Sequence, residues 1–218
     1  LGIRTENREF ARKIFHLIAL ILYIPPLQLS TFLISLLSNI DFFKQDTINT
    51  LISNPEVFLK NFLLAVSIST LTVFVILDFL RINTKLISYP SILIREKERK
   101  KFSGEFYLAS GIVTIAFVFS WDIIRASIIA SMLSDSAAAI IGSKFGRRKI
   151  LPHADRTLEG TVAEFVTAFL VLIPISNIVT SLLVALTIVL TDIYITTKIQ
   201  DNLIFPIITS FVLFLIMS

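Results

Sequence analysis

The chain has 218 residues, of which 55% are hydrophobic and 17% charged, and its mean hydropathy is +0.82. Soluble domains carry roughly 25% charged residues, so this chain is too apolar to be surrounded by water on every side. The lack of cysteine excludes a disulfide scaffold, a cysteine-ligated metal centre and a thiol nucleophile, and the composition excludes a collagen-like or disordered chain. We therefore expect an all-α polytopic membrane protein, whose net charge of +4 reflects its loops and does not indicate nucleic-acid binding.

Long apolar runs predict seven membrane-spanning helices in one domain over residues 1–218, since a span needs about 20 mostly apolar residues. The predicted helices cover residues 17–40, 61–77, 106–121, 123–142, 159–175, 178–197 and 202–218. The uncharged stretch from Phe165 to Thr191 is too long for one span, and Pro174 offers the turn that divides it. We interpret the first run as a span and not a cleaved signal peptide, because it is long and no small-residue cleavage site follows it.

The distribution of lysine and arginine agrees with this count of helices. With seven spans, the N-terminus and the segments 81–104, 143–158 and 198–201 lie on one side of the membrane with 17 basic residues, and the other side holds 3. Basic loops stay in the cytoplasm. The sequence therefore predicts a cytoplasmic N-terminus, in the plasma membrane of a prokaryote or the endoplasmic reticulum of a eukaryote.

Acidic residues lie inside or at the edges of the predicted spans, where charge is costly and usually functional. They are Asp78, Asp135, Glu159, Glu164 and Asp192. Because all five fall near the cytoplasmic ends of their helices, we expect an acidic cluster beside the basic loops, which suits a complex of Mg²⁺ with a polyphosphate. The alternative is that each acid caps a helix or pairs with a nearby base, as Asp78 can with Arg81; Asp135 has no base within one turn.

The densest chemistry lies between residues 134 and 164. Gly142 and Gly146 bracket Lys144, and glycine lets a backbone approach a phosphate closely. Further bases follow at Arg147, Arg148 and Lys149. The run Thr157-Leu158-Glu159-Gly160 opens the next predicted helix, whose free N–H groups would face the same spot. A basic loop that only sets topology or contacts anionic lipid is the alternative, and it leaves the glycines and flanking carboxylates unexplained.

Two further polar groups lie near the ends of the chain. A spacing of i, i+3, i+4 and i+7 puts four residues on one helical face at the entry to the membrane: Glu9, Arg12, Lys13 and His16. The alternative there is an interfacial helix with snorkelling bases and a pair between Glu9 and Lys13. Asp201 and Asn202 begin the last predicted helix, where the aspartate can be a simple N-cap and the asparagine can reach the site.

Together these residues resemble the CTP-dependent polyprenol kinase family, which includes dolichol kinase, phytol kinase and the CTP-dependent diacylglycerol kinase. The carriers are Glu9-x-x-Arg12-Lys13-x-x-His16, Asp78-Phe79-Leu80-Arg81, Glu98 with Gly104 and Tyr107, Asp135-x-x-Ala138-x-x-x-Gly142-x-x-x-Gly146, Arg156-Thr157-Leu158-Glu159-Gly160-Thr161, and Asp201-Asn202-Leu203 with Pro206. The block from Asp135 to Thr161 is the specific part. The chain departs from the family pattern at Ser134, where glycine is common, and at Arg156, where lysine is common. It looks like a minimal prokaryotic member.

The resemblance implies transfer of the γ-phosphoryl group of CTP to the hydroxyl of a dolichol-like membrane polyprenol, at the cytoplasmic face and with Mg²⁺ as cofactor. It implies that Asp135 and Glu159 are catalytic and hold the metal, and that His16 and Arg12 orient the acceptor or the transferred group. The nucleotide-binding residues that it implies are Gly142, Lys144, Gly146, Arg147, Arg148, Lys149, Arg156, Thr157, Gly160, Asp201 and Asn202. Phosphoryl transfer depends mostly on positioning and charge neutralisation, so no general base is assigned.

Other functions stay open at this point. The 135–161 block is also distantly similar to the CDP-diglyceride synthase family, so a CTP-dependent cytidylyltransferase that acts on a lipid phosphate is one alternative. Phytol, geranylgeraniol and diacylglycerol are alternative acceptors for a kinase. A transporter or lipid-binding protein is the third class, but it predicts polar residues along a path through the bilayer, and here they gather on one side. The oligomeric state is left open.

Overall fold

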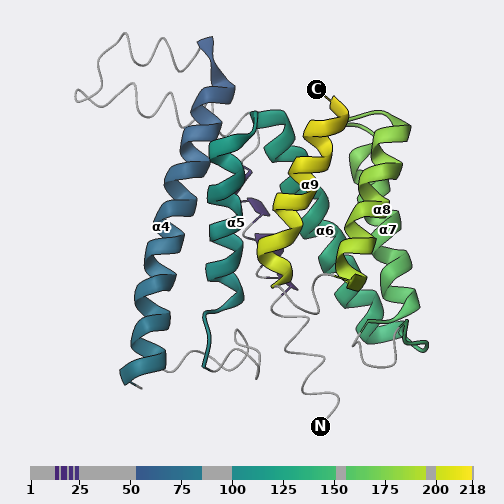
Figure 1. Ribbon diagram of the computed structural model, residues 1–218, viewed down its shortest axis with the longest axis horizontal. Coiled ribbons are helices and arrows are strands. Elements are labelled where there is room, and N and C mark those ends of the chain that lie inside the picture. The colour runs from purple at the N-terminus through teal and green to yellow at the C-terminus, as the bar shows by residue number, and fades with distance from the viewer. Residues whose placement is uncertain are drawn as a thin grey trace.

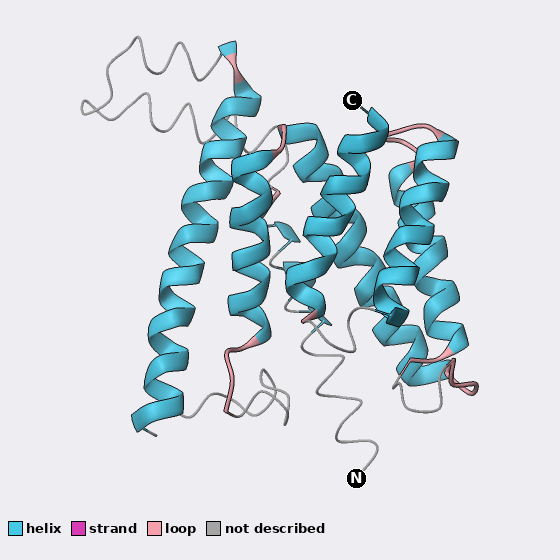
Figure 2. Cartoon of the chain, viewed as in Figure 1, coloured by secondary structure: helices cyan, strands magenta, loops and turns pink. Residues whose placement is uncertain are grey.

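The computed structural model describes residues 13–14, 16–18, 20–21, 23–24, 53–84, 100–150, 156–194 and 200–217. These residues are helical apart from short connections, and they contain no β-strand beyond an isolated bridge between Lys149 and Thr157 (Figures 1 and 2). A helical segment between Lys13 and Tyr23 precedes six helices. They are α4 (Pro55–Thr84), α5 (Gly104–Val118), α6 (Trp121–Phe145), α7 (Leu158–Leu172), α8 (Ile178–Tyr194) and α9 (Asp201–Met217).

The all-α prediction is confirmed over this part of the chain, and each of the six helices overlaps a predicted one. Most of the predicted first helix, residues 17–40, lies outside the described residues. The break between α5 and α6 falls at 119–120 and not at Asp122, as the apolar runs suggested. Ser120 has extended backbone, and Asp122 then occupies the first turn of α6, where an acid is favourable beside the free N–H groups.

Successive helices run in opposite directions, so the ends of α4, α6 and α8 share one end of the bundle with the starts of α5, α7 and α9 (Figure 1). Helix α6 packs against both α7 and α9, and α5 packs against α4 and α9. Because α6 contacts helices on several sides, residues on several of its faces are buried, including the serines Ser127, Ser131, Ser134 and Ser136. The Ser127 hydroxyl donates a hydrogen bond to the carbonyl of Pro206 in α9 at 2.8 Å.

Helix α4 extends well beyond its apolar run of 61–77, and the charged residues that border this run contact the two ends of α5. The Lys60 ammonium donates to the carbonyl of Phe119 at 2.8 Å, at the C-terminal end of α5. Asp78 accepts from Arg81 at 2.9 Å, and its other carboxylate oxygen accepts from the N–H and hydroxyl of Ser103 at 2.7 and 2.8 Å. The predicted pairing of Asp78 with Arg81 is therefore confirmed, and both oxygens of this buried carboxylate have partners.

The distribution of polar residues is the reverse of that in a water-soluble bundle, which turns its apolar side chains inward. Large apolar side chains such as Phe79, Phe117 and Ile178 are 60%, 68% and 66% exposed, whereas many serine and carboxylate side chains are buried. Helices α4 and α6 are long and apolar enough to cross a membrane, and α5, α8 and α9 are shorter apolar helices. These features favour a membrane-associated protein.

Small residues bring α6 and α7 close together. A Cβ atom on Gly160 of α7 would lie 2.9 Å from the carbonyl oxygen of Ala138 and 3.2 Å from Cα of Gly142, both in α6. Such close approach is typical of helix packing in membranes. The crossing point fixes which residues of the two helices face each other further along the bundle.

Replacing Gly160 with valine should destabilise the protein by about 1–3 kcal/mol, because the new side chain would collide with the backbone carbonyl of Ala138. Thermal unfolding in detergent should show a lower midpoint than that of the wild type. Val162→Ala, on the exposed face of the same helix, is the matched control and should change the midpoint little. A Gly160→Val protein as stable as the wild type would contradict this packing.

Candidate functional site

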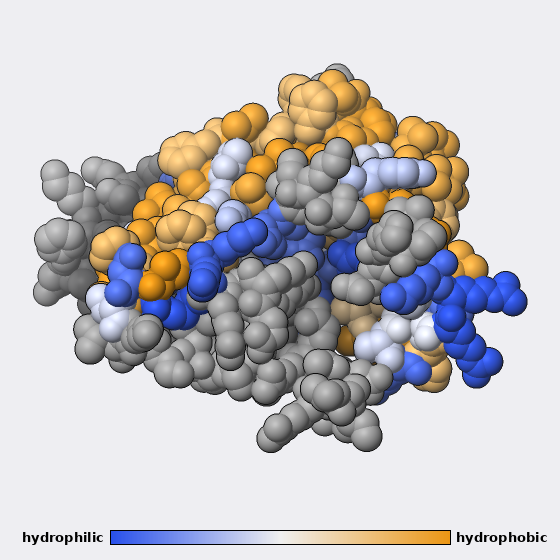
Figure 3. Space-filling model, turned by 60° about the horizontal axis from the view of Figure 1, so that its bottom comes forward, coloured by the Kyte–Doolittle hydropathy of each residue, from blue (hydrophilic) through white to orange (hydrophobic). Residues whose placement is uncertain are grey.

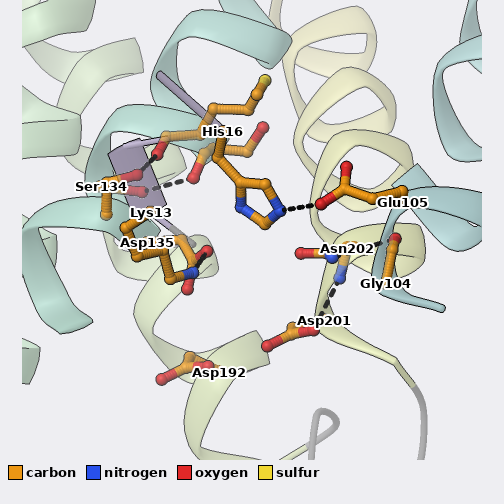
Figure 4. Close-up of polar contacts among 12 residues, drawn as sticks. Lys13, His16, Gly104, Glu105, Ser134, Asp135, Asp192, Asp201 and Asn202 are labelled. Carbon is orange, nitrogen blue, oxygen red and sulfur yellow. Dashed lines mark hydrogen bonds and ion pairs between the residues drawn. The ribbon is translucent and has the colours of Figure 1, made fainter. Parts of the chain in front are cut away.

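Six charged side chains, each from a different segment, converge inside the bundle; we call them the charge cluster. They are Lys13, Asp135, Arg156, Glu164, Asp192 and Asp201, from the N-terminal segment, α6, the residues before α7, α7, α8 and α9. Its four carboxylates are each no more than 5% exposed. Figure 4 shows most of the cluster beside His16 and Glu105. The cluster lies toward the end of the bundle where α8 ends and α9 begins.

Asp135 and Lys13 form a buried ion pair across 122 residues of sequence. Lys13 bonds to only one of the two carboxylate oxygens. The other, Oδ1 of Asp135, is buried and has no hydrogen-bond partner among the described residues. The sequence shows no base within a turn of Asp135 because its partner comes from another helix. Glu9, the alternative partner that we considered for Lys13, lies outside the described residues.

Arg156 forms ion pairs with acids near the end of α8 and at the start of α9. Its guanidinium lies 2.6 Å from Oδ1 of Asp192 and 3.7 Å from Oδ2 of Asp201. Burial opposes the charge of this group, but the carboxylates of Asp192, Asp135 and Asp201 outweigh that effect and raise the pKa of Arg156 above its ordinary value. The side chain remains 26% exposed. Arg156 is thus a fixed positive charge that links the buried carboxylates to the surface.

Glu164 lies in the interior without a compensating hydrogen bond. The residue is fully buried, and neither of its carboxylate oxygens has a partner among the residues that the structure describes. Most buried polar groups in proteins have at least one hydrogen bond, so a carboxylate with none calls for an explanation. The charges that act on it are those of Asp192, Asp135, Arg156 and Lys13.

A second polar group adjoins the charge cluster. Nε2 of His16 lies 3.0 Å from Oε1 of Glu105 at the start of α5. The amide of Asn202 donates to the carbonyl of Gly104 at 3.0 Å, and the N–H of Asn202 donates to Asp201 at 2.9 Å. These contacts fix the N-terminal segment and the first turn of α9 against α5 (Figure 4).

The described residues between α6 and α7, 146–150 and 156–157, fold back against each other and form what we call the basic loop. The N–H of Leu158 donates to the carbonyl of Arg148 at 2.8 Å, and the N–H of Ile150 donates to that of Arg156 at 3.2 Å. The Glu159 carboxylate accepts from the N–H groups of Arg147 and Arg148 at 3.1 and 3.4 Å. The hydrogen bonds that Glu159 accepts therefore hold Arg147 and Arg148 of the loop against the start of α7. The exposed bases of this loop and of the end of α6 are Lys144, Arg147, Arg148 and Lys149.

The glycines of the block have a packing role in this structure. A Cβ on Gly142 would lie 3.0 Å from Oγ1 of Thr157, and one on Gly146 would lie 2.7 Å from the same atom and in collision with the carbonyl of Gly142. Thr157 itself caps α7 by accepting from the N–H of Gly160 at 3.2 Å. The glycines thus let the loop close around the threonine. Their predicted approach to a phosphate stays a prediction.

The predicted site residues fall into two groups in space. The interior group contains His16, Asp135, Arg156, Asp201 and Asn202. The second group lies on or next to the basic loop, is exposed or half-buried except for the buried Gly160, and contains Gly142, Lys144, Gly146, Arg147, Arg148, Lys149, Thr157, Glu159 and Gly160. The prediction that Asp135 and Glu159 hold one metal ion together gains no contact from the structure, since the hydrogen bonds of Glu159 go to the loop. Arg12 lies outside the described residues.

Four residues of the interior were not assigned a role from the sequence. The sequence placed Lys13 on the same helical face as His16, three residues later. That shared face indicated that the two side chains point the same way, and both are buried. Glu164 and Asp192 were identified as costly acids, and burial now explains why each interrupts an apolar run. Glu105 gave no signal beyond its place in the first turn of a predicted helix.

The interior group fits a divalent cation bound together with phosphate. Among the described residues, no three histidine, aspartate or glutamate side chains are arranged to hold a metal ion by themselves. Mg²⁺ usually takes only one or two carboxylates, and substrate phosphates and water complete its shell. The partnerless Oδ1 of Asp135 is the kind of ligand that this mode of binding needs.

The chain was compared with known proteins at three levels. No protein-family model, curated protein sequence or solved structure matches it.

The ion pair of Lys13 and Asp135 should be strongly coupled. Lys13→Met should destabilise the protein by about 3–5 kcal/mol, because it leaves a buried carboxylate without its counter-charge. Adding Asp135→Asn removes that charge. The loss of unfolding free energy in the double variant should therefore be smaller than the sum of the losses in the two single variants. Thermal unfolding of the wild type, both single variants and the double variant measures the coupling. Strictly additive effects would show that the two side chains do not interact.

Proposed function

We propose that this protein is an integral membrane lipid kinase that transfers the γ-phosphoryl group of CTP to the hydroxyl of a membrane polyprenol. The observation that carries the proposal is the charge cluster: buried acids and bases inside an otherwise apolar bundle, with carboxylate oxygens that lack partners among the described residues. Intramembrane charge is costly and is usually kept for function. The proposal includes seven spans and a cytoplasmic N-terminus, which the 17 to 3 split of basic residues supports.

The location of the cluster suits a reaction between a lipid and a charged nucleotide. Arg156 precedes α7, and Asp201 begins α9, so the cluster reaches the same end of the bundle as the basic loop. Glu164 is six residues into α7, or about 9 Å along its axis. Hydrophilic residues gather on this face of the molecule, flanked by hydrophobic surface (Figure 3). A triphosphate can enter from the water, and a prenol can present its hydroxyl from the bilayer at the same depth.

The proposed reaction is a displacement at the γ-phosphorus. The lipid hydroxyl oxygen forms a bond to the γ-phosphorus, and the bond from that phosphorus to the β,γ-bridging oxygen breaks. CDP leaves with the bonding electron pair, and the hydroxyl proton is released to solvent. Such a transition state needs positioning and charge neutralisation more than it needs covalent help from the protein.

The side chains present can supply both requirements. Arg156 is held in place by two carboxylates and is partly open to the surface, so it can contact phosphate oxygens as a fixed cation. The bases of the 144–149 loop raise the local concentration of the triphosphate. Lys13 orients Asp135, and the His16–Glu105 and Asn202 contacts hold the N-terminal segment and α9 against α5, beside the cluster, where the acceptor hydroxyl can bind. Asp135 would hold Mg²⁺, which would supply positive charge beside the phosphates.

The choice of CTP and of a polyprenol is supported by the sequence resemblance, whereas the buried charge cluster supports a site for a charged ligand inside an apolar bundle. The kinase and a cytidylyltransferase differ in the phosphorus atom that is attacked. A cytidylyltransferase joins the α-phosphorus of CTP to a lipid phosphate and releases pyrophosphate. The position of the labelled phosphorus in CTP therefore distinguishes the two reactions, whichever lipid is the acceptor.

Purified protein in detergent with Mg²⁺ should transfer label from [γ-³²P]CTP, and not from [α-³²P]CTP, to an extractable lipid when polyprenols are present. Asp135→Asn should lower this transfer by at least about 100-fold, because it removes the charge at the proposed metal site. Asp122→Asn is the matched control: the same helix and the same change, but at the other end, where Asp122 is exposed and pairs with Arg125 at 3.0 Å. Its transfer rate should equal that of the wild type.

The other outcomes are equally informative. Label from the α position in lipid, with a lipid phosphate as acceptor, would make the protein a cytidylyltransferase. No transfer from either position by folded protein, over prenol, phytol and diacylglycerol acceptors, would contradict the enzyme proposal. Equal loss in Asp135→Asn and Asp122→Asn would remove the link to the charge cluster.

A further inference from the structure

We infer that Glu164 and Asp135, on facing helices, form the carboxylate part of a divalent-cation site, and that Glu159 is not one of its ligands. The inference rests on the proposed function only for the identity of the phosphate that would complete the metal's shell. The carboxylates themselves are a property of the fold and can be tested without any nucleotide.

The helix crossing places the two carboxylates at the same level. Gly160 of α7 touches Ala138 of α6 at the crossing. The two helices run in opposite directions (Figure 1). Asp135 lies about one turn before Ala138 in α6, and Glu164 lies about one turn after Gly160 in α7. Both acids are therefore displaced from the contact toward the same end of the bundle. Residues three and four apart share a helical face, so both side chains project toward the helix contact. Glu159 lies on the opposite side of the crossing, toward the loop.

Unused oxygens distinguish these two acids from the structural acids of the same bundle. Oδ1 of Asp135 and both oxygens of Glu164 are buried without partners among the described residues. Asp78 is as deeply buried, yet both of its oxygens accept hydrogen bonds, from Arg81 and Ser103. Asp78, an acid with a structural role, thus has hydrogen bonds to both carboxylate oxygens. Asp135 and Glu164 have oxygens without a hydrogen bond among the described residues. A cation that takes oxygen ligands is the partner that would satisfy them.

The charge of the cluster supports the same conclusion. In the described part of the chain the charge cluster has four carboxyl groups against two cationic side chains, an excess of two acidic groups. The adjoining His16–Glu105 pair contributes a further carboxylate with an imidazole beside it. Buried charges without counter-charges are costly. One divalent cation between Asp135 and Glu164 would offset the excess of the cluster.

The test measures Mn²⁺ binding to the purified protein in detergent without nucleotide. The decrease in the EPR signal of free Mn²⁺ reports how much ion is bound. The wild type should bind one Mn²⁺ that Mg²⁺ displaces. Glu164→Gln and Asp135→Asn should each weaken this binding at least about tenfold, whereas Glu159→Gln and the control Asp122→Asn should bind as the wild type does. Thermal unfolding provides a second readout: Mn²⁺ should raise the midpoint of the wild type and leave that of Glu164→Gln unchanged.

Folding of the variants is controlled by the same unfolding curves. Without cation, Glu164→Gln should be at least as stable as the wild type, because it removes an uncompensated buried charge. Wild-type affinity for Mn²⁺ in Glu164→Gln, or its loss in Glu159→Gln, would overturn the inference. Mn²⁺ bound at Glu164 without label transfer from CTP would keep the cation site and reject the kinase. Label transfer from CTP that survives Glu164→Gln but not Glu159→Gln would keep the kinase and reject the proposed cation site.

Discussion

The cost of burying charge in an apolar bundle is the constraint on which the rest of this structure depends. The outer faces of the helices are apolar, so the interior is the place where ionisable side chains can find partners. Lys13 and Arg156 supply counter-charges, and each comes from outside the helix of the acid that it pairs with. The N-terminal segment, α6, α8 and α9 are therefore held together by ion pairs as well as by packing. Removal of Lys13 takes away the cation that pairs with the buried Asp135 carboxylate, which is costly.

Two kinds of buried acid occur in the same fold, and the contrast between them is what points to function. Asp78 is fully hydrogen-bonded and caps a helix, so its role is complete within the protein. Asp135 and Glu164 keep oxygens without partners in the described structure. A fold that can satisfy one buried carboxylate with four donated hydrogen bonds is able to satisfy others. These open oxygens are the basis on which we propose a cation bound together with phosphate at this end of the bundle.

Much of the fold could be predicted from the sequence because the apolar runs of α4 to α9 are long and separated by charged segments. The boundaries were less predictable: α4 extends past its apolar run, and the charges that border the run, Lys60 and Asp78, have partners at the ends of a neighbouring helix that the sequence does not reveal. For the site, Asp135 and Arg156 were accessible because a charge inside or beside a span stands out. The partnership of Asp135 with Lys13 was not, since it depends on how two helices 122 residues apart pack.

Glu159 and Glu164 illustrate the same limit more sharply. Both lie close to Gly160 in the sequence, and the motif that contains Glu159 made it the natural metal ligand. In three dimensions the Gly160 crossing separates them: Glu159 folds the basic loop, and Glu164 enters the interior. Spacing along a helix gives the face of a residue, but the side of a helix crossing on which it lies depends on the partner helix. The glycines, too, have a packing role that their flexibility alone did not suggest.

Equilibrium binding of CTP to the purified protein tests the central claim most directly, because it asks whether the charge cluster holds a nucleotide with its cation, apart from any acceptor lipid. The account predicts saturable binding of labelled CTP that requires Mg²⁺, that unlabelled CTP displaces and that Asp135→Asn abolishes in a protein that remains folded. CTP binding that is indifferent to Mg²⁺ and to Asp135, or no binding at all, would contradict the account.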